Sequence, residues 1–293
     1  MPNYKTHSIH GEIVLPNINN RVYIDNEAIK TYSMGPDVLI STDYKTFNTQ
    51  HCRNTRDYFL LLIELIKTNK LYDNSEVMAY LYGQIDHYIL DILLHPLIYY
   101  MSEDIDSNCK LGGHGLIENW IDDYIIDKYD KNDIFYYRKN STNDKELNNI
   151  IDEVYNKIFN RKNESIKYNI GIFLTILYDS LARRNLIGIF PLINKIFNIG
   201  DIINNSNYDR VIPYLNLDNS IWTNPVSGEE YNYTFDDLWD KSIEEAINTI
   251  EDINNYFYNN KSINNKYILN NLSYNTGYPC CDKEKFVYVK KYK

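Results

Sequence analysis

Apolar residues recur at helical spacing along most of the chain, whereas alternating apolar and polar positions flanked by turn residues are scarce. The N-terminal part of this pattern predicts helices over 6–15, 25–33 and 56–70, followed by a long helix that begins near Ser75. Thr55 and Ser75 are candidate N-caps of the last two helices, because a hydroxyl at that position can accept a free backbone N–H. The pattern is typical of an all-α protein.

The second half of the chain continues the helical pattern with weaker boundaries. Further helices are expected over 116–129, after the glycine-rich turn LGGHG, and over 146–159, inside a charged surface segment at 139–165. The apolar segment 166–199 is also expected to be helical, with a break at Pro191. A loop at 200–233 then precedes a helix over 235–257. Thr234 followed by Asp237 resembles a capping box at the start of the last helix. We therefore expect one all-helical domain at 1–260, with metal ligands in 1–122, supporting helices in 145–260, and an Asn-rich tail at 261–293.

The most apolar helix carries ionisable residues that it should not bury without partners. The stretch GQIDHYILDILLHPLIYY, residues 83–100, contains Asp86, His87, Asp91 and His95. Burial of a neutral polar group without a hydrogen bond costs about 2 kcal/mol or more, and burial of an unpaired charged group costs more than that. His87, Asp91 and His95 are spaced four residues apart, so their side chains project from one face of the helix. A bound cation is one partner that would compensate them.

All six histidines lie in the first 114 residues, and a second pair with the same spacing, His114 and Glu118, follows on the next predicted helix. Imidazole and carboxylate ligands suit zinc where thiolates are absent. For a single histidine, a hydrogen-bonded core or surface position is the commoner explanation. Asp37, beside the turn residues Gly35 and Pro36, fits a turn or N-cap aspartate as well as a ligand. The clustering of the whole set favours a metal site.

Charge and cysteine content narrow the possible partners and compartments. The net charge of −10 argues against a general polyanion binder and against adsorption to anionic membranes. The four cysteines show no CxxC spacing and no disulfide framework, which fits a reducing compartment. The start of the sequence has no secretory pattern, and the apolar run at 58–66 is too short to span a bilayer. We expect a cytoplasmic protein without a transmembrane segment.

Taken in order, these motifs resemble the zinc-dependent phospholipase C family, in particular its cytoplasmic bacterial-type members without a signal peptide. The resemblance begins with MPNYKTHSIHGEIV and covers most of the chain. It continues through GPD at 35–37, His51, HYILDILLHP at 87–96, HGLIENWID at 114–122 and WTNPVSGEEYNYTFDDLWDKSIEEAI at 222–247. The succession HxxxD, HP and HxxxE is the most specific part.

The resemblance implies a multi-helix bundle around a cluster of two or three zinc ions. The implied ligands of one ion are Asp37, His51, His87 and Asp91, and those of a second are His95, His114 and Glu118. A third ion would be bound by His7, with His10 as the alternative, and Asp91 would bridge to it. Asp86, Asp122 and Asp123 are candidates to orient the imidazoles from behind. The two residues Arg183 and Arg184 could clamp a phosphate or form surface ion pairs.

The implied activity is hydrolysis of phosphoric esters, as a phosphodiesterase of phospholipase C type that acts through a metal-bridged hydroxide. Asp37 is the candidate catalytic residue, as a general base or purely as a ligand. The expected substrate is a small phosphoester or a phospholipid head group. Two alternatives stay open: a zinc enzyme related to single-strand-specific nucleases, which would act on nucleic acid, and a non-catalytic helical binding protein stabilised by metal. The sequence gives no oligomeric state.

Overall fold

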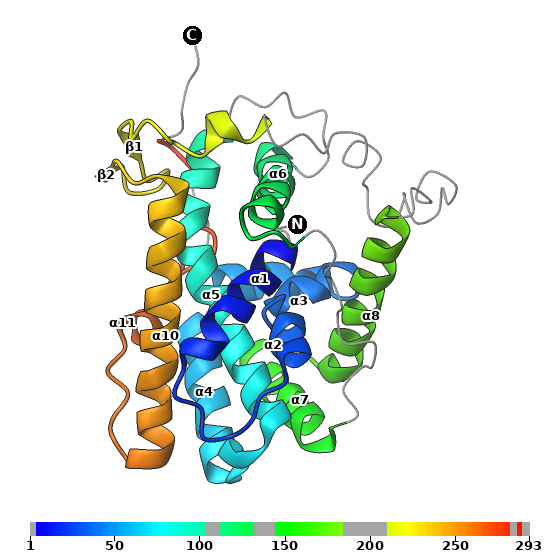
Figure 1. Ribbon diagram of the computed structural model, residues 1–293. Helices are drawn as coiled ribbons and strands as arrows, with labels where there is room; N and C mark the ends of the chain where they lie inside the picture. Colours follow the sequence, from blue (N-terminus) through cyan, green and yellow to red (C-terminus); the bar gives the residue numbers. More distant parts are fainter. Residues whose placement is uncertain (1–3, 103–111, 132–143, 184–209, 282–285, 289–293) are drawn as a thin grey trace.

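The computed structural model describes residues 4–102, 112–131, 144–183, 210–281 and 286–288 (Figure 1). In these ranges every regular element except one two-stranded hairpin is helical. The predicted all-α class is confirmed. No helix in the described ranges has the length and apolar character needed to cross a membrane.

The predicted α-helices are present in the described ranges with shifted ends, and the helices at 44–52 and 266–269 were not predicted. The α-helices are α1 (Tyr4–Val14), α2 (Asn26–Tyr32), α3 (Tyr44–Cys52), α4 (Thr55–Thr68), α5 (Ser75–Met101), α6 (Gly112–Lys128), α7 (Lys145–Phe159), α8 (Glu164–Arg183), α10 (Phe235–Asn259) and α11 (Lys266–Leu269). Short 3-10 helices are η1 (Leu15–Asn17), η2 (Gly35–Ser41), η3 (Leu71–Asp73) and η6 (Ile212–Tyr214). Strands β1 (Trp222–Thr223) and β2 (Glu230–Tyr231) pair antiparallel.

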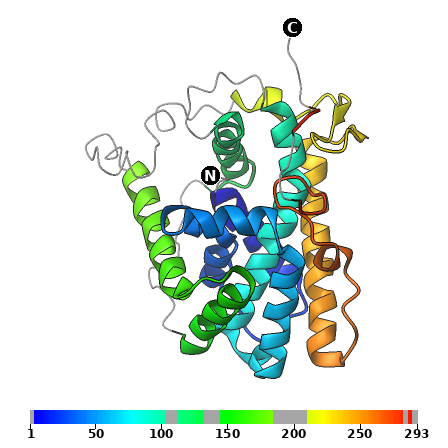
Figure 2. The same ribbon diagram turned by 180° about the vertical axis from the view of Figure 1, so that it is seen from behind.

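Helix α5 is the axis of the bundle, and both views of the ribbon show other helices packed around its length (Figures 1 and 2). It is apolar around nearly its whole circumference, which is typical of a helix enclosed by others. Helices α10, α2 and α1 pack directly on it, and α6 contacts it toward its C-terminal end. Most side chains of α5 are therefore buried among the neighbouring helices.

Two of the predicted N-caps were wrong by one residue. Helix α4 begins at Thr55 after Asn54, and the Thr55 hydroxyl donates instead to the carbonyl of Leu272 at 2.8 Å. The N-cap of α5 is Asn74, whose side chain accepts two backbone N–H groups. The capping box at Thr234 and Asp237 is confirmed. An Asn cap and a Ser cap are nearly equivalent in energy, so neighbouring cap residues are hard to separate by sequence.

The helix predicted at 146–159 is confirmed, and one segment predicted as a loop carries more structure than expected. Residues 145–159 form the amphipathic helix α7, whose apolar side is buried in the core. The loop predicted at 200–233 contains the hairpin of β1 and β2. The glycine-rich turn at 111–115 is largely helical, because α6 already begins at Gly112. Pro191 lies outside the described residues.

The chain after Asn260 turns back onto the bundle. Tyr267 and Ile268 of α11 are buried, and Tyr274 is fully enclosed in the main core. The division between a domain at 1–260 and a tail stays a prediction. Residues 261–281 nevertheless supply buried core side chains, and one of them reaches the polar cluster described below.

Replacing Tyr82 by Phe should lower the free energy of unfolding by about 1–2 kcal/mol. The Tyr82 hydroxyl on α5 donates to Asn254 Oδ1 on α10 at 2.6 Å, in a buried position. The single substitution leaves that amide oxygen without a donor. The double variant Tyr82→Phe, Asn254→Leu removes both partners and should recover part of the loss. Urea denaturation of the three proteins measures this, and a double variant less stable than the single one would contradict it.

Candidate metal centre

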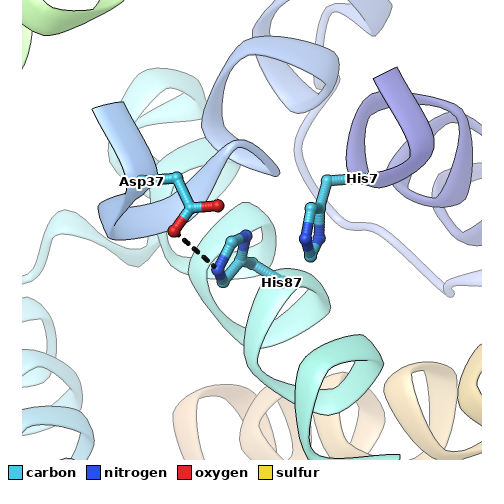
Figure 3. A group of neighbouring side chains, drawn as sticks. All are labelled: His7, Asp37 and His87. Atoms are coloured by element: carbon cyan, nitrogen blue, oxygen red, sulfur yellow. Dashed lines mark ion pairs between the residues drawn. The ribbon is translucent and has the colours of Figure 1, made fainter. Parts of the chain in front are cut away.

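Side chains from five elements converge beside the middle of α5. His7 comes from α1, Asp37 from η2, His51 from α3 and Glu118 from α6, while His87, Asp91 and His95 come from α5 itself. Each of the seven is at most 4% exposed. Figure 3 shows three of them, with Asp37 and His7 approaching His87 from different elements. The structure thus brings together residues spread over more than a hundred positions of sequence.

The turn before Asp37 explains how this aspartate reaches α5. Gly35 has φ of 58°, and a Cβ at this position would lie 2.3 Å from Cγ of His87. Only glycine fits a left-handed conformation pressed against the imidazole in this way. Pro36 follows as the second residue of η2, where its missing N–H is not needed in the first turn. The GPD motif therefore places the Asp37 carboxylate close to the ring of His87.

One half of the cluster surrounds Asp37. Its Oδ1 lies 3.0 Å from Nε2 of His51 and 3.7 Å from Nε2 of His87, the contact drawn as a dashed line in Figure 3. The ring of His7 stacks on that of His87, with centroids 3.9 Å apart. Two groups whose donor atoms all lie within 4.8 Å of one another could each hold a metal ion: His7, Asp37 and His87, and His51, His87 and Asp91.

Asp91 lies at the middle of the cluster. Its two carboxylate oxygens are within 3.9 Å of Nε2 atoms from four histidines, at 3.3 Å, 3.9 Å, 3.0 Å and 3.5 Å for His7, His51, His87 and His95. On the far side His95 also reaches Glu118, with Nε2 and Oε1 3.0 Å apart. A carboxylate between several imidazoles can bridge two cations, one on each oxygen.

Backbone carbonyls fix the tautomers of three imidazoles. Nδ1 of His51, His87 and His95 lies 2.9 Å, 3.0 Å and 2.8 Å from the carbonyl oxygens of Phe47, Ser33 and Tyr274, respectively. A carbonyl only accepts, so each Nδ1 carries a proton. In the neutral ring the Nε2 lone pair then faces the carboxylates. Two acceptors facing each other at 3 Å repel unless a proton or a metal cation lies between them.

Several atoms of the cluster are buried without hydrogen bonds in the described structure. They are both carboxylate oxygens of Asp37, Oδ2 of Asp91, Oε2 of Glu118, Nδ1 of His7, and Nε2 of His51 and of His87. Such a concentration of unsatisfied buried groups is costly in a native core. Nitrogen and oxygen donors without thiolate are a suitable set for zinc. The residues present therefore fit the metal that the sequence motifs predicted.

Without a cation, the cluster is charged and holds protons. Burial disfavours the imidazolium of His95, but Asp91 and Glu118 outweigh it and raise its pKa to about 10. The pKa of His87 is likewise raised against burial, by Asp91 and Asp37. Burial alone would raise the pKa of Asp91, yet His95, His87 and His7 hold it well below its usual range. Metal uptake at neutral pH must displace protons from these rings.

A small cavity opens on the side of His7, Asp91, His95 and Glu118. Its volume is about 20 Å³, and apolar side chains from α5 and α6 complete its wall. That is room for about one water molecule, for which about 10–15 Å³ is the minimum. The polar face of this cavity lies beside the most strongly charged part of the cluster.

The remaining predicted residues have other surroundings. His114 is half-buried on the first turn of α6, one turn before Glu118, and its ring contacts Tyr99 with centroids 4.7 Å apart. Burial lowers the pKa of His114 and so favours the neutral ring that a metal requires. His10 is not in the cluster, because its ring nitrogens contact Asp86 at 2.6 Å and Ser242 at 2.8 Å.

Two of the three aspartates expected behind the imidazoles have other partners. Asp86 pairs with His10, and Asp122 accepts the backbone N–H and the hydroxyl of Thr6, so it ties α1 to α6. The acceptors behind the three cluster imidazoles are backbone carbonyls instead. Sequence reasoning missed them because a carbonyl is present at every residue. Arg184 and the side chain of Arg183 lie outside the described residues.

Comparison with known families agrees with this geometry. The family model described as zinc dependent phospholipase C matches residues 6–165, which is more than half of the chain. The protein belongs to this family. The matched region of this zinc-dependent phospholipase C family member contains all the candidate ligands from His7 to Glu118. No curated protein and no solved structure matches the chain.

The metal-free protein should lose stability as the pH rises from 7.5 to 9.5. His95 has a pKa of about 10 when folded and an ordinary value of 6.5. Its bound proton therefore stabilises the fold fully below pH 6.5, and this contribution disappears as the pH approaches 10. The slope should reach up to about 1.4 kcal/mol per pH unit for one proton. Denaturation of chelator-treated protein across this range measures it, and His95→Gln should flatten the slope.

Proposed function

We propose that the protein is a zinc-dependent hydrolase of phosphoric esters, acting as a phosphodiesterase on a small phosphoester or a phospholipid head group. The observation that carries this proposal is Asp91, a buried carboxylate within 3.9 Å of four histidine Nε2 atoms. Membership of the zinc-dependent phospholipase C family supports zinc as the cation and a phosphoester as the substrate.

The proposed ligand sets follow the two halves of the cluster. Asp37, His51, His87 and Asp91 would hold one ion, His95, His114 and Glu118 a second, and His7 with Asp91 a third. Support for this division comes from Asp91, whose Oδ2 lies nearest His87 and whose Oδ1 lies nearest His7 and His95. Bound zinc would supply Lewis acidity toward the phosphoryl oxygens and would lower the pKa of a coordinated water.

The chain's own residues provide orientation and proton transfer. The carbonyls of Phe47, Ser33 and Tyr274 keep three Nε2 lone pairs directed into the site. The apolar wall of the cavity, from α5 and α6, limits the entry of further water. Asp37 is the proposed catalytic residue, because both of its oxygens are buried without hydrogen bonds and one of them can accept a proton from the attacking water.

The purified protein should contain two or three zinc ions per chain. A His87→Ala, Asp91→Ala double variant should lose most of this metal, because it removes the central bridge and the ring beside it. The Tyr82→Phe, Asn254→Leu double variant is the control, since it also changes a buried polar pair that involves α5 but lies outside the cluster. Inductively coupled plasma mass spectrometry gives the stoichiometry. Fewer than one ion in the wild type after incubation with zinc would reject the metal centre.

Asp37→Asn should lower kcat for a phosphodiester by about 100-fold or more, the usual contribution of a general base. The assay compares a short-chain phosphatidylcholine, a soluble aryl phosphodiester and single-stranded DNA. Turnover of either of the first two supports the proposal. Preference for DNA would instead indicate a nuclease, and metal content without turnover of any phosphoester would indicate a structural zinc protein. Zinc content and KM of Asp37→Asn show whether Asp37 acts mainly as a base or as a ligand.

A further inference from the structure

A short hairpin near the C-terminus contacts the metal centre directly. Residues 271–280, here called the C-terminal strap, form a bridge between Leu272 and Pro279, with Ser273 N–H donating to the Tyr278 carbonyl at 2.7 Å. The N–H of Cys280 donates back to the Asn271 carbonyl at 2.8 Å. The strap lies more than a hundred residues beyond the end of the family match at residue 165.

Tyr274 connects the strap to two ligands at opposite ends of the cluster. Its backbone N–H donates to the carbonyl of His51 at 2.9 Å, and its own carbonyl accepts Nδ1–H of His95 at 2.8 Å. The Ser273 hydroxyl donates to the same His51 carbonyl at 3.1 Å. The Tyr274 ring packs against His51 and His87, with centroids 4.9 Å and 5.8 Å apart. One residue thus holds a ligand of the Asp37 half and a ligand of the Glu118 half.

The strap is fixed to α5 where that helix has a proline. Pro96 has no N–H, so it cannot make the helical hydrogen bond to the carbonyl of Ile92. Gly277 packs at this carbonyl: it has φ of 64°, and a Cβ there would lie 2.4 Å from the Ile92 oxygen. The carbonyl of Leu272 at the other end accepts the Thr55 hydroxyl at 2.8 Å. The turn of the strap therefore packs on α5, which carries three candidate ligands, and Leu272 is hydrogen-bonded to α4, which follows the helix that carries His51.

We propose that the C-terminal strap is a positioning element of the metal centre, with Tyr274 as a positioning residue that fixes the tautomer and orientation of His95 and the placement of His51. This inference rests on the proposed function for its consequence in catalysis. Its structural part, the control of the His95 ring by Tyr274, holds whether or not the enzyme hydrolyses a phosphodiester. Outer hydrogen-bond partners of metal-bound imidazoles typically change metal affinity or activity by about 10–100-fold.

Gly277→Ala in the full-length protein should weaken zinc binding by about 10-fold or more and lower kcat with little change in KM. The added Cβ would collide with backbone and move the strap away from α5. Gly228→Ala is the matched control, because Gly228 also has a positive φ, of 76°, but the three atoms nearest to its Cβ would all belong to the side chain of Tyr288, not to backbone. Chelator competition gives the affinity, and the visible spectrum of the cobalt-substituted protein reports ligand geometry.

A second pair of variants separates positioning from folding. Ser273→Ala removes the hydroxyl that donates to His51 and should change the cobalt spectrum in the same direction, less strongly. Ser165→Ala is the matched control: it removes a buried serine hydroxyl that donates to Asp152 on α7, outside the cluster, so this variant should bind zinc like the wild type.

Histidine-selective ¹⁵N NMR tests the contact without metal or substrate. In the wild type, Nδ1–H of His95 should exchange slowly with solvent, and exchange should be at least 10-fold faster in Gly277→Ala, or in Ser273→Ala if the first variant does not fold. Unchanged exchange, zinc affinity and cobalt spectrum in a folded strap variant would overturn the inference. A wild type that takes up no zinc would instead overturn the proposed function, while the exchange comparison still decides the strap.

Discussion

The central constraint of this protein is the burial of Asp91 in the middle of an apolar helix. A carboxylate this far from water is stable only when positive charge surrounds it, and four imidazoles do so here. The imidazoles are themselves buried and need partners, which are Asp37, Glu118 and three backbone carbonyls. Protons can satisfy it in part, and a cation with nitrogen and oxygen ligands satisfies it more completely. The arrangement of helices around α5 follows from this need.

The helices that bring ligands are held in place by separate polar contacts. Helix α1 must present His7 to the cluster, and it is attached on either side of that residue, by Asp122 at Thr6 and by Asp86 and Ser242 at His10. These contacts join α1 to α6, α5 and α10. Because they lie outside the cluster, they can keep α1 in place whether the centre contains protons or metal. The buried polar groups thus divide into those that hold the helices together and those that belong to the candidate metal centre.

The sequence predicted most of the helices and the identity of the clustered residues. Spacing of four on α5 placed His87, Asp91 and His95 on one face, and the structure has all three directed into one site. What the sequence could not predict was set by tertiary contacts. Asn74 and Ser75 are both good caps, so local chemistry did not choose between them. The second histidine of α1 pairs with Asp86, and only the packing of the helices decides which histidine faces the cluster.

The acceptors behind the imidazoles show why a family match can end before the residues that complete its candidate metal centre. Holding a ring by its Nδ1–H requires a carbonyl at the right place, and any residue can supply one. The match to the family ends at residue 165, yet the carbonyl that holds His95 belongs to Tyr274. Side chains that bind metal must be particular residues, whereas the backbone that orients them need only be rigid and close. Gly277 and Pro96 provide that closeness. Pro96 belongs to the HP motif of the resemblance, whereas no motif of the sequence marks Gly277.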